Sequence, residues 1–434
     1  STWLFACVLL PASPAMAASN LWTLYQEMQK NDPAILQLHA LNTAADARED
    51  EAKGRLLPQI GLSHSLSRTQ RDANLSQDTY DGQSHAITLR QPLYDPVAWQ
   101  SYKRYQEMAQ EQHWSSQEKS TQNALQFVEL YFAALAADDE RALTQAELNA
   151  TQRNQSRLQA LYQRQLATLP DMLEVEARVT TLEASLLEAD NTIHDSRERL
   201  AERVGRPIEE SLWPLNDATE LDSLLRTATD WELLALQQNP ALKSHTHHIE
   251  AATHAWREAR ASHLPQVNLN LSAQRSDIGY EGSLSPQSTT LMALVGIQIP
   301  LFSGGATHAR STARYAEKMA AEQDYERQKR EVIRQVRAMR HKVDAGNSRI
   351  QASLKAKHAA EKSRQAAERA FELGVFTAVQ VLERIQDEYR AHRNLLQAKY
   401  SHINNILMLY RWSGALTSDD IQRGNDLLLA PTPQ

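Results

Sequence analysis

Four histidines in one short stretch are the side chains of this sequence best suited to chemistry: His245, His247, His248 and His254. Imidazole is a common zinc ligand, so the group invites a metal-binding interpretation. On a helix, however, side chains meet when they are three or four residues apart, and only some of these pairs have that spacing. No cysteine accompanies them. We therefore interpret the group as a solvated helix face and predict no metal site.

Other familiar chemical motifs are absent from the sequence. Gly304-Gly305 stands where a strand would turn into a helix, but the Gly-Lys-Ser/Thr of a phosphate-binding loop does not follow. The sequence contains neither Gly-x-Ser-x-Gly nor His-Glu-x-x-His. We predict a protein that is not an enzyme and that binds no cofactor.

Composition excludes two further classes. The formal net charge is −7, and nucleic-acid binding calls for a basic face. No window approaches the roughly 20 apolar residues of a membrane-spanning helix, which excludes a helical membrane protein. Only 13 Gly and 15 Pro serve 434 residues, too few for the loops of several compact domains. Most of the chain must therefore be regular and extended.

The first residues are typical of an export signal. An apolar run over residues 2–10 leads to the small residues Ala15-Met16-Ala17. Such a pattern precedes signal-peptide cleavage, so we predict that residues 1–17 direct export and are removed. Cys7 is the only cysteine, so the remaining chain would contain neither a disulfide nor a reactive thiol.

The rest of the sequence is duplicated. Pro33 recurs as Pro240 and Pro92 as Pro300, at offsets of 240−33 = 207 and 300−92 = 208. Farther on, Thr168 recurs as Thr377, at 377−168 = 209. So small a drift indicates an internal repeat. We place the first repeat at 18–205, a linker at 206–230, the second repeat at 231–414 and a final irregular segment at 415–434.

Each repeat is expected to consist mainly of long helices. Residues 97–166 contain no proline, and about seventy helical residues make a rod on the order of 100 Å long. We expect helices over about 21–55, 97–166, 172–204, 231–263, 306–373 and 379–412, with turns at 167–171 and 374–377. In the second long rod the apolar residues are spaced as in a coiled-coil seam, at Val332, Val336, Met339, Val343 and Ile350.

Between the rods lie two predicted hairpins, at 56–93 and 264–301. Their residues alternate between apolar and polar, for example Val267, Leu269 and Leu271 against Asn268 and Asn270. One apolar and one polar face over about ten residues is typical of a transmembrane β-strand. We expect the polar loops 69–83 and 276–288 to connect the strands. A soluble hairpin packed on a core has the same pattern, but no sequence remains to form that core.

Four strands cannot close a barrel, and an open sheet edge is not stable in lipid. Twelve strands from three chains would close with an even number. The fold class predicted is therefore mainly α with a small β part, in which coiled-coil helices form an α-barrel tunnel and a trimer closes a 12-stranded β-barrel. The linker 206–230 and the segment 415–434 would form a belt around the rods.

These features together resemble the TolC family of outer-membrane channel proteins over about residues 20–420. The similar pieces are prolines at the strand–helix junctions, the run Pro300-Leu301-Phe302-Ser303-Gly304-Gly305, and the turn from Phe371 to Thr377. The junction prolines are Pro58, Pro92, Pro265 and Pro300. The resemblance implies a homotrimeric, passive duct through outer membrane lipid and periplasm.

The resemblance also implies roles for residues of the two helix turns. Family members carry acidic rings that constrict the inner entrance of the tunnel, and acidic rings favour cations. Asp171 matches the acid of the first turn and Glu383 one of two in the second, while Gln380 replaces the other. The turn tyrosine of the family is Phe371 here, and the first turn's glycine is Gln165. Helix-end acids in solvent are the alternative reading of Asp171 and Glu383.

Partners follow from the same resemblance. A periplasmic adaptor would dock its helical hairpins at the turn tips, which we identify as Gln165, Thr168, Phe371, Gly374 and Thr377. An inner-membrane ABC exporter or proton-driven pump would supply the energy, for type I protein secretion or for multidrug efflux. The competing interpretation is a soluble periplasmic coiled-coil scaffold, in which the four strands form ordinary hairpins.

Overall fold

The computed structural model describes residues 19–73, 76–216, 221–226, 230–280, 283 and 287–429. The predicted signal peptide, with Cys7, lies outside the described residues. The chain divides into two compact units, each made from separate stretches of sequence. The first comprises Ser1–Gln37, Lys119–Asn239 and Glu331–Gln434, and the second comprises Leu38–Glu118 and Pro240–Arg330.

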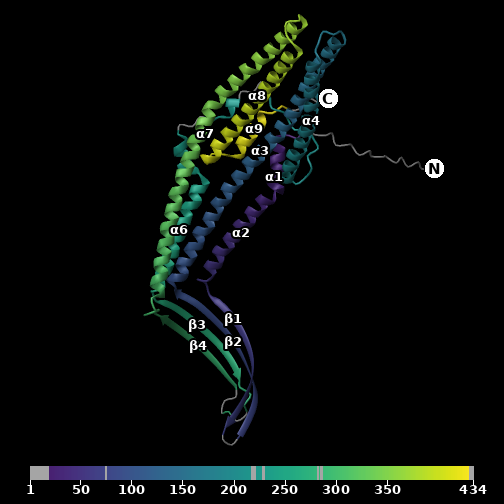
Figure 1. Ribbon diagram of the computed structural model, residues 1–434. Coiled ribbons are helices and arrows are strands. Elements are labelled where there is room, and N and C mark those ends of the chain that lie inside the picture. Colours follow the sequence, from purple (N-terminus) through teal and green to yellow (C-terminus); the bar gives the residue numbers. More distant parts are fainter. Residues whose placement is uncertain are drawn as a thin grey trace, which may run out of the picture. The chain divides into compact units, whose positions relative to one another are not determined.

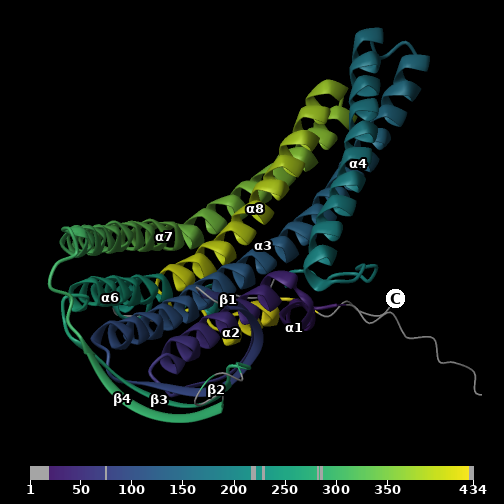
Figure 2. The same cartoon turned by 90° about the horizontal axis from the view of Figure 1, so that it is seen from below.

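The second unit contains one antiparallel sheet of four strands, in the order β1-β2-β3-β4. Figures 1 and 2 show the strands side by side and curved. Their bounds are β1 Gln59–Ala73, β2 Ser76–Tyr94, β3 Gln266–Asp277 and β4 Gln287–Gln298. Because β2 pairs with β3, the hairpins of the two sequence repeats form one continuous sheet.

One face of this sheet is apolar and exposed. Leu62 pairs with Ile87, Ile87 with Ala273, and Ala273 with Leu291, so one row of apolar residues crosses all four strands. Leu62 and Leu291 are each 79% exposed, so no described part of the chain covers them. A face of this kind is suited to contact with lipid.

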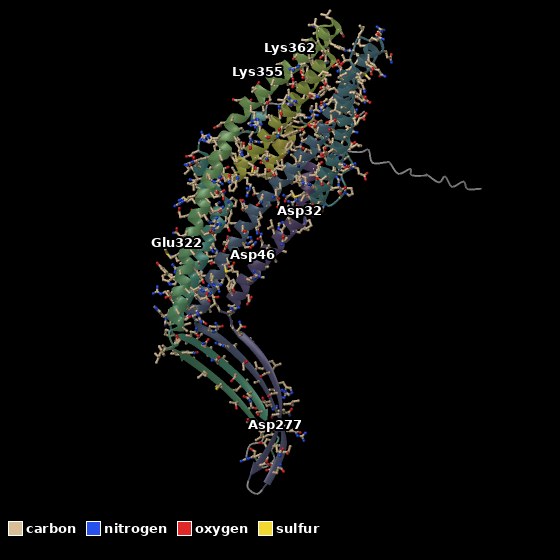
Figure 3. All side chains as sticks on the ribbon, viewed as in Figure 1. Asp32, Asp46, Asp277, Glu322, Lys355 and Lys362 are labelled. Atoms are coloured by element: carbon tan, nitrogen blue, oxygen red, sulfur yellow. The ribbon has the colours of Figure 1, made fainter. Side chains whose placement is uncertain are left out.

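The prediction of a polar loop over 69–83 is wrong. β1 continues to Ala73 and β2 begins at Ser76, and polar residues such as Arg71 and Asp78 are cross-strand partners. Alternation of apolar and polar residues ends near Leu66, but hydrogen bonding between the strands does not require it. The expected loop 276–288 is nearly right, because β3 ends at Asp277 and β4 begins at Gln287. Asp277 lies at the end of the sheet away from the helices (Figure 3).

Three of the four junction prolines lie just outside a strand, as expected, and the fourth, Pro92, does not. Pro58 and Pro265 directly precede β1 and β3, and Pro300 follows β4 by two residues. Pro92 lies inside β2, where the pairing with β3 shifts register between Pro92 and Tyr94. Since proline has no N–H to donate to a ladder, its place at an irregularity is physically reasonable.

The helices follow the expected pattern closely. They are α1 Leu21–Asn31, α2 Pro33–Gly54, α3 Pro96–Gln163, α4 Leu169–Val204, η1 Leu221–Leu224, α5 Trp231–Gln238, α6 Pro240–Ala261, α7 Ala306–Glu372, α8 Ala378–Trp412 and α9 Ser418–Asp426. Asp32-Pro33 and Asn239-Pro240 separate α1 from α2 and α5 from α6. The final segment is less irregular than predicted, because α9 occupies its centre.

The core of the first unit joins both repeats. The seam residues of α7, from Val332 to Ile350, are all buried, as the heptad spacing predicts. Tyr410 of α8 is fully buried; its hydroxyl donates to the carbonyl of Leu224 at 2.7 Å and accepts from the N–H of Arg226 at 2.6 Å. Residues 221–226 of the segment between the repeats are thereby anchored to α8.

No helix among the described residues has a stretch long and apolar enough to cross a membrane.

Candidate functional site

Two turns join the long helices of the first unit, and both use the same backbone motif. In the first, the N–H of Leu166 donates to the carbonyl of Leu161 and the N–H of Gln165 to that of Tyr162, each at 2.9 Å. The second repeats both bonds from Val375 and Gly374, at 2.9 and 3.0 Å. This is a Schellman end, which requires a left-handed residue after the helix.

The left-handed position is Gly374 in one turn and Gln165 in the other. Their φ angles are +74° and +62°, and Gln165 is the only non-glycine residue with a positive φ in the described part of the chain. A side chain in that conformation is strained by about 1–3 kcal/mol. The departure from glycine noted in the sequence therefore has a structural cost, and the two turns are not equivalent.

A threonine begins the helix after each turn. The Oγ1 of Thr168 accepts from the N–H of Asp171 at 3.3 Å and donates to Asp171 Oδ2 at 2.7 Å. The Oγ1 of Thr377 accepts from the N–H of Gln380 at 3.2 Å, and Gln380 Oε1 accepts from the N–H of Thr377 at 2.8 Å. Asp171 and Gln380 thus contribute to the starts of α4 and α8. A helix-end acid was the alternative reading of Asp171, whereas no such role was expected for Gln380.

Phe371 packs where the four long helices meet below the turns. It contacts a buried apolar cluster whose members come from α3, α4 and α8: Leu158, Val175, Ala378 and Leu382. Asn154 of α3 adds a buried hydrogen bond from its Nδ2 to the carbonyl of Ala378, at 3.1 Å. The phenyl ring therefore fixes the two hairpins to one another through packing.

Glu383 lies on the exposed face of α8, one turn beyond its start. Its carboxylate is 3.3 Å from Arg384, which also contacts Asp387 at 2.9 Å. The Glu383 side chain is 58% exposed, so Arg384 partly offsets its charge but leaves the carboxylate accessible to solvent. Arg384 was not among the residues expected at this site, although it directly follows Glu383 in the sequence.

A buried carboxylate links three helices of this unit farther from the turns. Glu147 of α3 is 1% exposed; Oε1 accepts from Arg178 of α4, and Oε2 accepts from Arg393 of α8 at 3.1 Å. Two arginines around one buried acid compensate the loss of hydration. Arg393 also donates to Glu140 at 2.6 Å.

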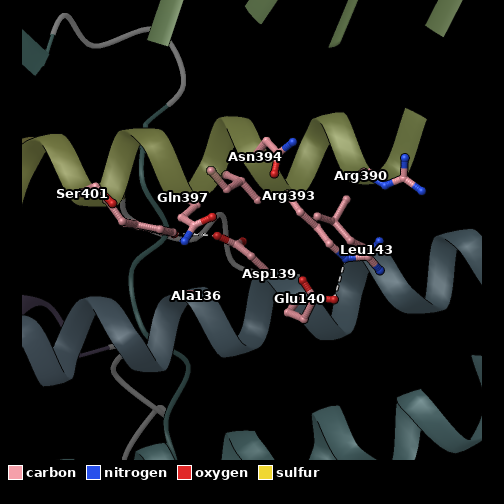
Figure 4. Close-up of a pocket in the computed structure, with 11 residues that line it drawn as sticks. Ala136, Asp139, Glu140, Leu143, Arg390, Arg393, Asn394, Gln397 and Ser401 are labelled. Atoms are coloured by element: carbon pink, nitrogen blue, oxygen red, sulfur yellow. Dashed lines mark hydrogen bonds and ion pairs between the residues drawn. The ribbon is translucent and has the colours of Figure 1, made fainter. Parts of the chain in front are cut away.

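Beside this network, a groove of about 440 Å³ runs between α3 and α8. Figure 4 shows Asp139 and Glu140 on one wall and Arg393 on the other. The hydroxyl of Tyr400 donates to Asp139 at 2.5 Å across it. The groove is mostly apolar between these polar contacts, which suits the side chains of a helix.

The histidine group in the second unit is partly solvated, as expected, but its members are also paired with other helices, which the expectation did not include. His247 pairs with Glu107 at 2.7 Å, His248 with Glu111 at 3.0 Å, and His245 with Asp324 at 3.3 Å. His254 Nδ1 lies 2.8 Å from Gln100 Oε1. The pairings were not expected because the partners lie on α3 and α7, more than seventy residues away in sequence.

Their protonation differs accordingly. The hydrogen bond to Glu111 raises the pKa of His248 above its ordinary value, against a smaller opposing effect of burial. Burial lowers the pKa of His245 despite Asp324, and burial also lowers that of His254. The contacts of α6 with its neighbouring helices therefore include histidines whose pKa values are shifted in opposite directions.

The outer membrane efflux protein family model matches this chain twice, over residues 24–206 and 233–415. Because these spans cover most of the chain, it belongs to that family. The offsets, 233−24 and 415−206, are both 209 residues and agree with the internal repeat.

Individual relatives agree with this membership. The alkaline protease secretion protein AprF of Pseudomonas aeruginosa is 28% identical, with 97% of this chain and 90% of AprF covered. The outer membrane protein TolC of Vibrio cholerae is 27% identical, covering 95% and 94%. The structure of the CmeC outer membrane channel of Campylobacter jejuni has the same fold, with a TM-score of 0.82 at 14% identity, covering 94% and 90%.

The class of protein follows. The chain is an outer-membrane transport protein that extends into the periplasm, as the resemblance to the TolC family implied. Its relatives are channel and transport proteins, and the scaffold alternative is not favoured.

Proposed function

We propose that three copies of the chain form one continuous passive duct, with a 12-stranded β-barrel in the outer membrane and an α-helical tunnel in the periplasm. The observation that carries the proposal is the open sheet. Among the described residues of one chain, β1 pairs only with β2 and β4 only with β3, while the apolar face is exposed. Lipid does not tolerate open edges, and closure by further copies satisfies them.

Mass measurement of the purified full chain in detergent tests this assembly. We expect a stable species of three chains by light scattering corrected for bound detergent. A monomer or a dimer as the stable form would contradict the proposal, because neither closes the edges of β1 and β4 with twelve strands.

The periplasmic entrance lies at the two turns in this proposal. Three copies of Glu383 would form an acidic ring, and Asp171 would contribute a second set of carboxylates while also accepting from the hydroxyl of Thr168, the N-cap of α4. Gln380 contributes no charge, and its side-chain oxygen is used in the cap of α8. The entrance would therefore carry fewer charges than a ring with acids at both positions of the second turn.

The turn tips are also suited to contact a partner. Large apolar side chains are exposed there: Leu166 at 70%, Leu373 at 80% and Val375 at 73%. They lie among Gln165, Thr168, Gly374 and Thr377, the predicted docking positions. Exposed apolar groups on two neighbouring turns favour a helical hairpin of a periplasmic adaptor as the partner.

Site-directed crosslinking tests adaptor docking. The sequence has a single cysteine, Cys7, so Leu166→Cys or Val375→Cys introduces a unique thiol outside the predicted signal peptide. We expect crosslinks to a co-expressed adaptor from these positions and none from Glu188→Cys on α4. Equal yields from all three positions, or no adduct at any, would contradict docking at the tips.

We infer an unfolded polypeptide as the cargo, with small amphipathic toxins as the alternative. The similarity to AprF, a protease secretion protein, supports type I secretion driven by an ABC exporter. Expression of the chain in Pseudomonas aeruginosa lacking AprF tests it. We expect alkaline protease to reach the medium; its retention in cells that produce the assembled channel would favour small-molecule efflux and a proton-driven pump.

A further inference from the structure

Three potential metal ligands come together between α7 and α8. Glu361 lies on α7, while Glu388 and His392 lie four residues apart on one face of α8. One ligand atom from each of these three residues lies within 4.8 Å of the other two. The stretch of α7 between Lys355 and Lys362, both labelled in Figure 3, carries a second histidine, His358.

The carboxylate of Glu361 has an imidazole nitrogen close to each of its oxygens. His392 Nε2 is 3.0 Å from Oε1, and His358 Nδ1 is 3.3 Å from Oε2. The two helices therefore supply a His-x-x-Glu pair and a Glu-x-x-x-His pair. Both spacings place the side chains of a pair on the same face of a helix.

Each of the two carboxylates has a basic side chain next to one of its oxygens, Arg364 at Glu388 and Lys357 at Glu361. Arg364 donates to Oε2 of Glu388, which is 7% exposed, and has a second acidic partner, Glu368, at 2.8 Å. Lys357 lies 3.6 Å from Glu361 Oε1. A metal-ligating carboxylate commonly accepts a hydrogen bond on its other oxygen, so Arg364 can remain on Glu388 when an ion is bound.

The other repeat shows that packing of the hairpin does not require this cluster. The offset at the turns is 209 residues, and subtracting it from 358, 361, 388 and 392 gives Asn149, Gln152, Val179 and Glu183. The pair of α3 and α4 thus forms the same kind of helix hairpin without two histidines and two glutamates. The cluster is an addition to the second repeat.

We propose that Glu361, Glu388 and His392 bind a divalent transition-metal ion of the zinc class, with His358 as the fourth ligand. Two imidazoles and two carboxylates suit tetrahedral Zn²⁺, whose bonds to N and O are about 2.0–2.2 Å. Adjacent ligand atoms of such a site lie about 3.4 Å apart. The atoms of Glu361, Glu388 and His392 already lie within 4.8 Å of one another, whereas His358 contacts Glu361 alone and would have to turn toward the other two. This site is independent of the proposed duct function.

Bound metal would fasten α7 to α8 near their turn. Glu361 precedes Gly374 by 13 residues, about 20 Å along the helix. An ion there adds a crosslink between two helices that otherwise meet through apolar packing and ion pairs. It therefore stabilises the second hairpin and leaves the first unchanged.

Equilibrium binding to the purified full chain tests the site. After treatment with EDTA, the protein is titrated with Zn²⁺, and the visible absorption of bound Co²⁺ reports tetrahedral nitrogen and oxygen ligation. We expect His392→Gln and His358→Gln each to weaken the tightest binding at least tenfold. The control His194→Gln removes an exposed imidazole of α4 and should leave binding unchanged.

Thermal unfolding separates loss of the site from loss of the fold. In EDTA, His358→Gln should unfold close to the temperature of the unmodified chain, while His392→Gln also loses its contact with Glu361 and should unfold somewhat lower. Added Zn²⁺ should raise the unfolding temperature only where the site is intact. If His392→Gln fails to fold, His358→Gln, whose side chain is 60% exposed, provides the comparison. Zn²⁺ binding as tight in a folded ligand variant as in the unmodified chain, or no Zn²⁺ binding by the unmodified chain, would overturn the proposal.

Discussion

Thr377 and Gln380 cap α8 by exchanging hydrogen bonds in both directions, each side chain accepting from the backbone N–H of the other residue. Removing the hydroxyl leaves an N–H without its partner at a helix start. Thr377→Ala should destabilise the first turn of α8 by about 0.5–2 kcal/mol, and Gln380→Ala by less. Hydrogen exchange of the amides at 379–381 measures this, with faster exchange expected in both variants.

Thr377→Ser is the matched control, because serine keeps the hydroxyl. Its exchange rates should stay near those of the unmodified chain. Slow exchange in Thr377→Ala would show that packing of Ala378, rather than the cap, holds this turn.

Gly205 and Gly414 occupy equivalent places at the ends of the two repeats but differ in their surroundings. A Cβ on Gly414 would lie 2.6 Å from the backbone carbon of Gln238, whereas one on Gly205 would lie 3.4 Å from the Cβ of Asn31. Both have positive φ, so alanine is strained at either place by about 1–2 kcal/mol. Gly414→Ala should cost clearly more, because backbone must move.

Thermal unfolding of the two alanine variants checks this difference. Gly205→Ala should lower the unfolding temperature slightly and Gly414→Ala strongly. Equal shifts would mean that the φ angle alone sets the cost and that the close approach to Gln238 is relieved without loss of stability.

Glu147 should be among the most sensitive positions of the first unit. Glu147→Gln removes the charge between Arg178 and Arg393 and leaves two partly buried cations facing each other. We expect a loss of about 3–5 kcal/mol, the range for breaking a buried ion pair. Glu140→Gln, whose side chain is 45% exposed, should cost no more than about 1 kcal/mol.

Chemical denaturation of both variants gives the comparison. A Glu147→Gln variant as stable as Glu140→Gln would show that water or a rearranged neighbour replaces the carboxylate. The assignment of Glu147 as the link between α3, α4 and α8 would then be wrong.

Histidine protonation gives the helices of the second unit a pH dependence. The pKa of His248 is raised from 6.5 by Glu111, so its contribution to stability is fully present below pH 6.5 and is lost as pH rises through the folded-state pKa. His248→Gln should remove this contribution, at most about 1 kcal/mol for a half-exposed pair. Hydrogen exchange of α6 at about pH 5 and pH 8 measures it.

His254 should behave in the opposite sense. Burial lowers the pKa of His254 in the folded state, so protonation favours the unfolded state. The free energy of unfolding should therefore decrease as the pH drops below the ordinary histidine pKa of 6.5. His254→Gln should therefore make α6 less sensitive to acid. Identical pH profiles for the His248 and His254 variants would contradict the assigned directions.

Much of the fold was predictable because its signals are local. Prolines mark strand and helix boundaries, alternation identifies the apolar sheet face, and the heptad spacing of Val332 to Ile350 identifies a buried seam. The extension of β1 and β2 beyond Leu66 was not predictable from alternation, because polar cross-strand pairs carry no periodic apolar signal.

Site residues were harder to predict because their roles depend on partners distant in sequence. The caps are an exception, because Thr168 and Asp171, like Thr377 and Gln380, are only three residues apart, and their spacing was a usable signal. Three histidines of α6 pair with acids on other helices and His254 with Gln100, and Glu361 meets His392 only through the register of α7 against α8. Spacing within one helix cannot reveal such pairs.

The central claim is a water-filled duct whose periplasmic entrance is narrowed by Glu383, and single-channel recording of the purified chain in planar bilayers tests it most directly. We expect discrete channels that divalent cations block from the periplasmic side, with block weakened in Glu383→Ala and unchanged in the α4 control Glu188→Ala. Absence of conductance from the assembled protein would contradict the duct. Conductance and block in Glu383→Ala identical to those of the unmodified chain would contradict the acidic entrance.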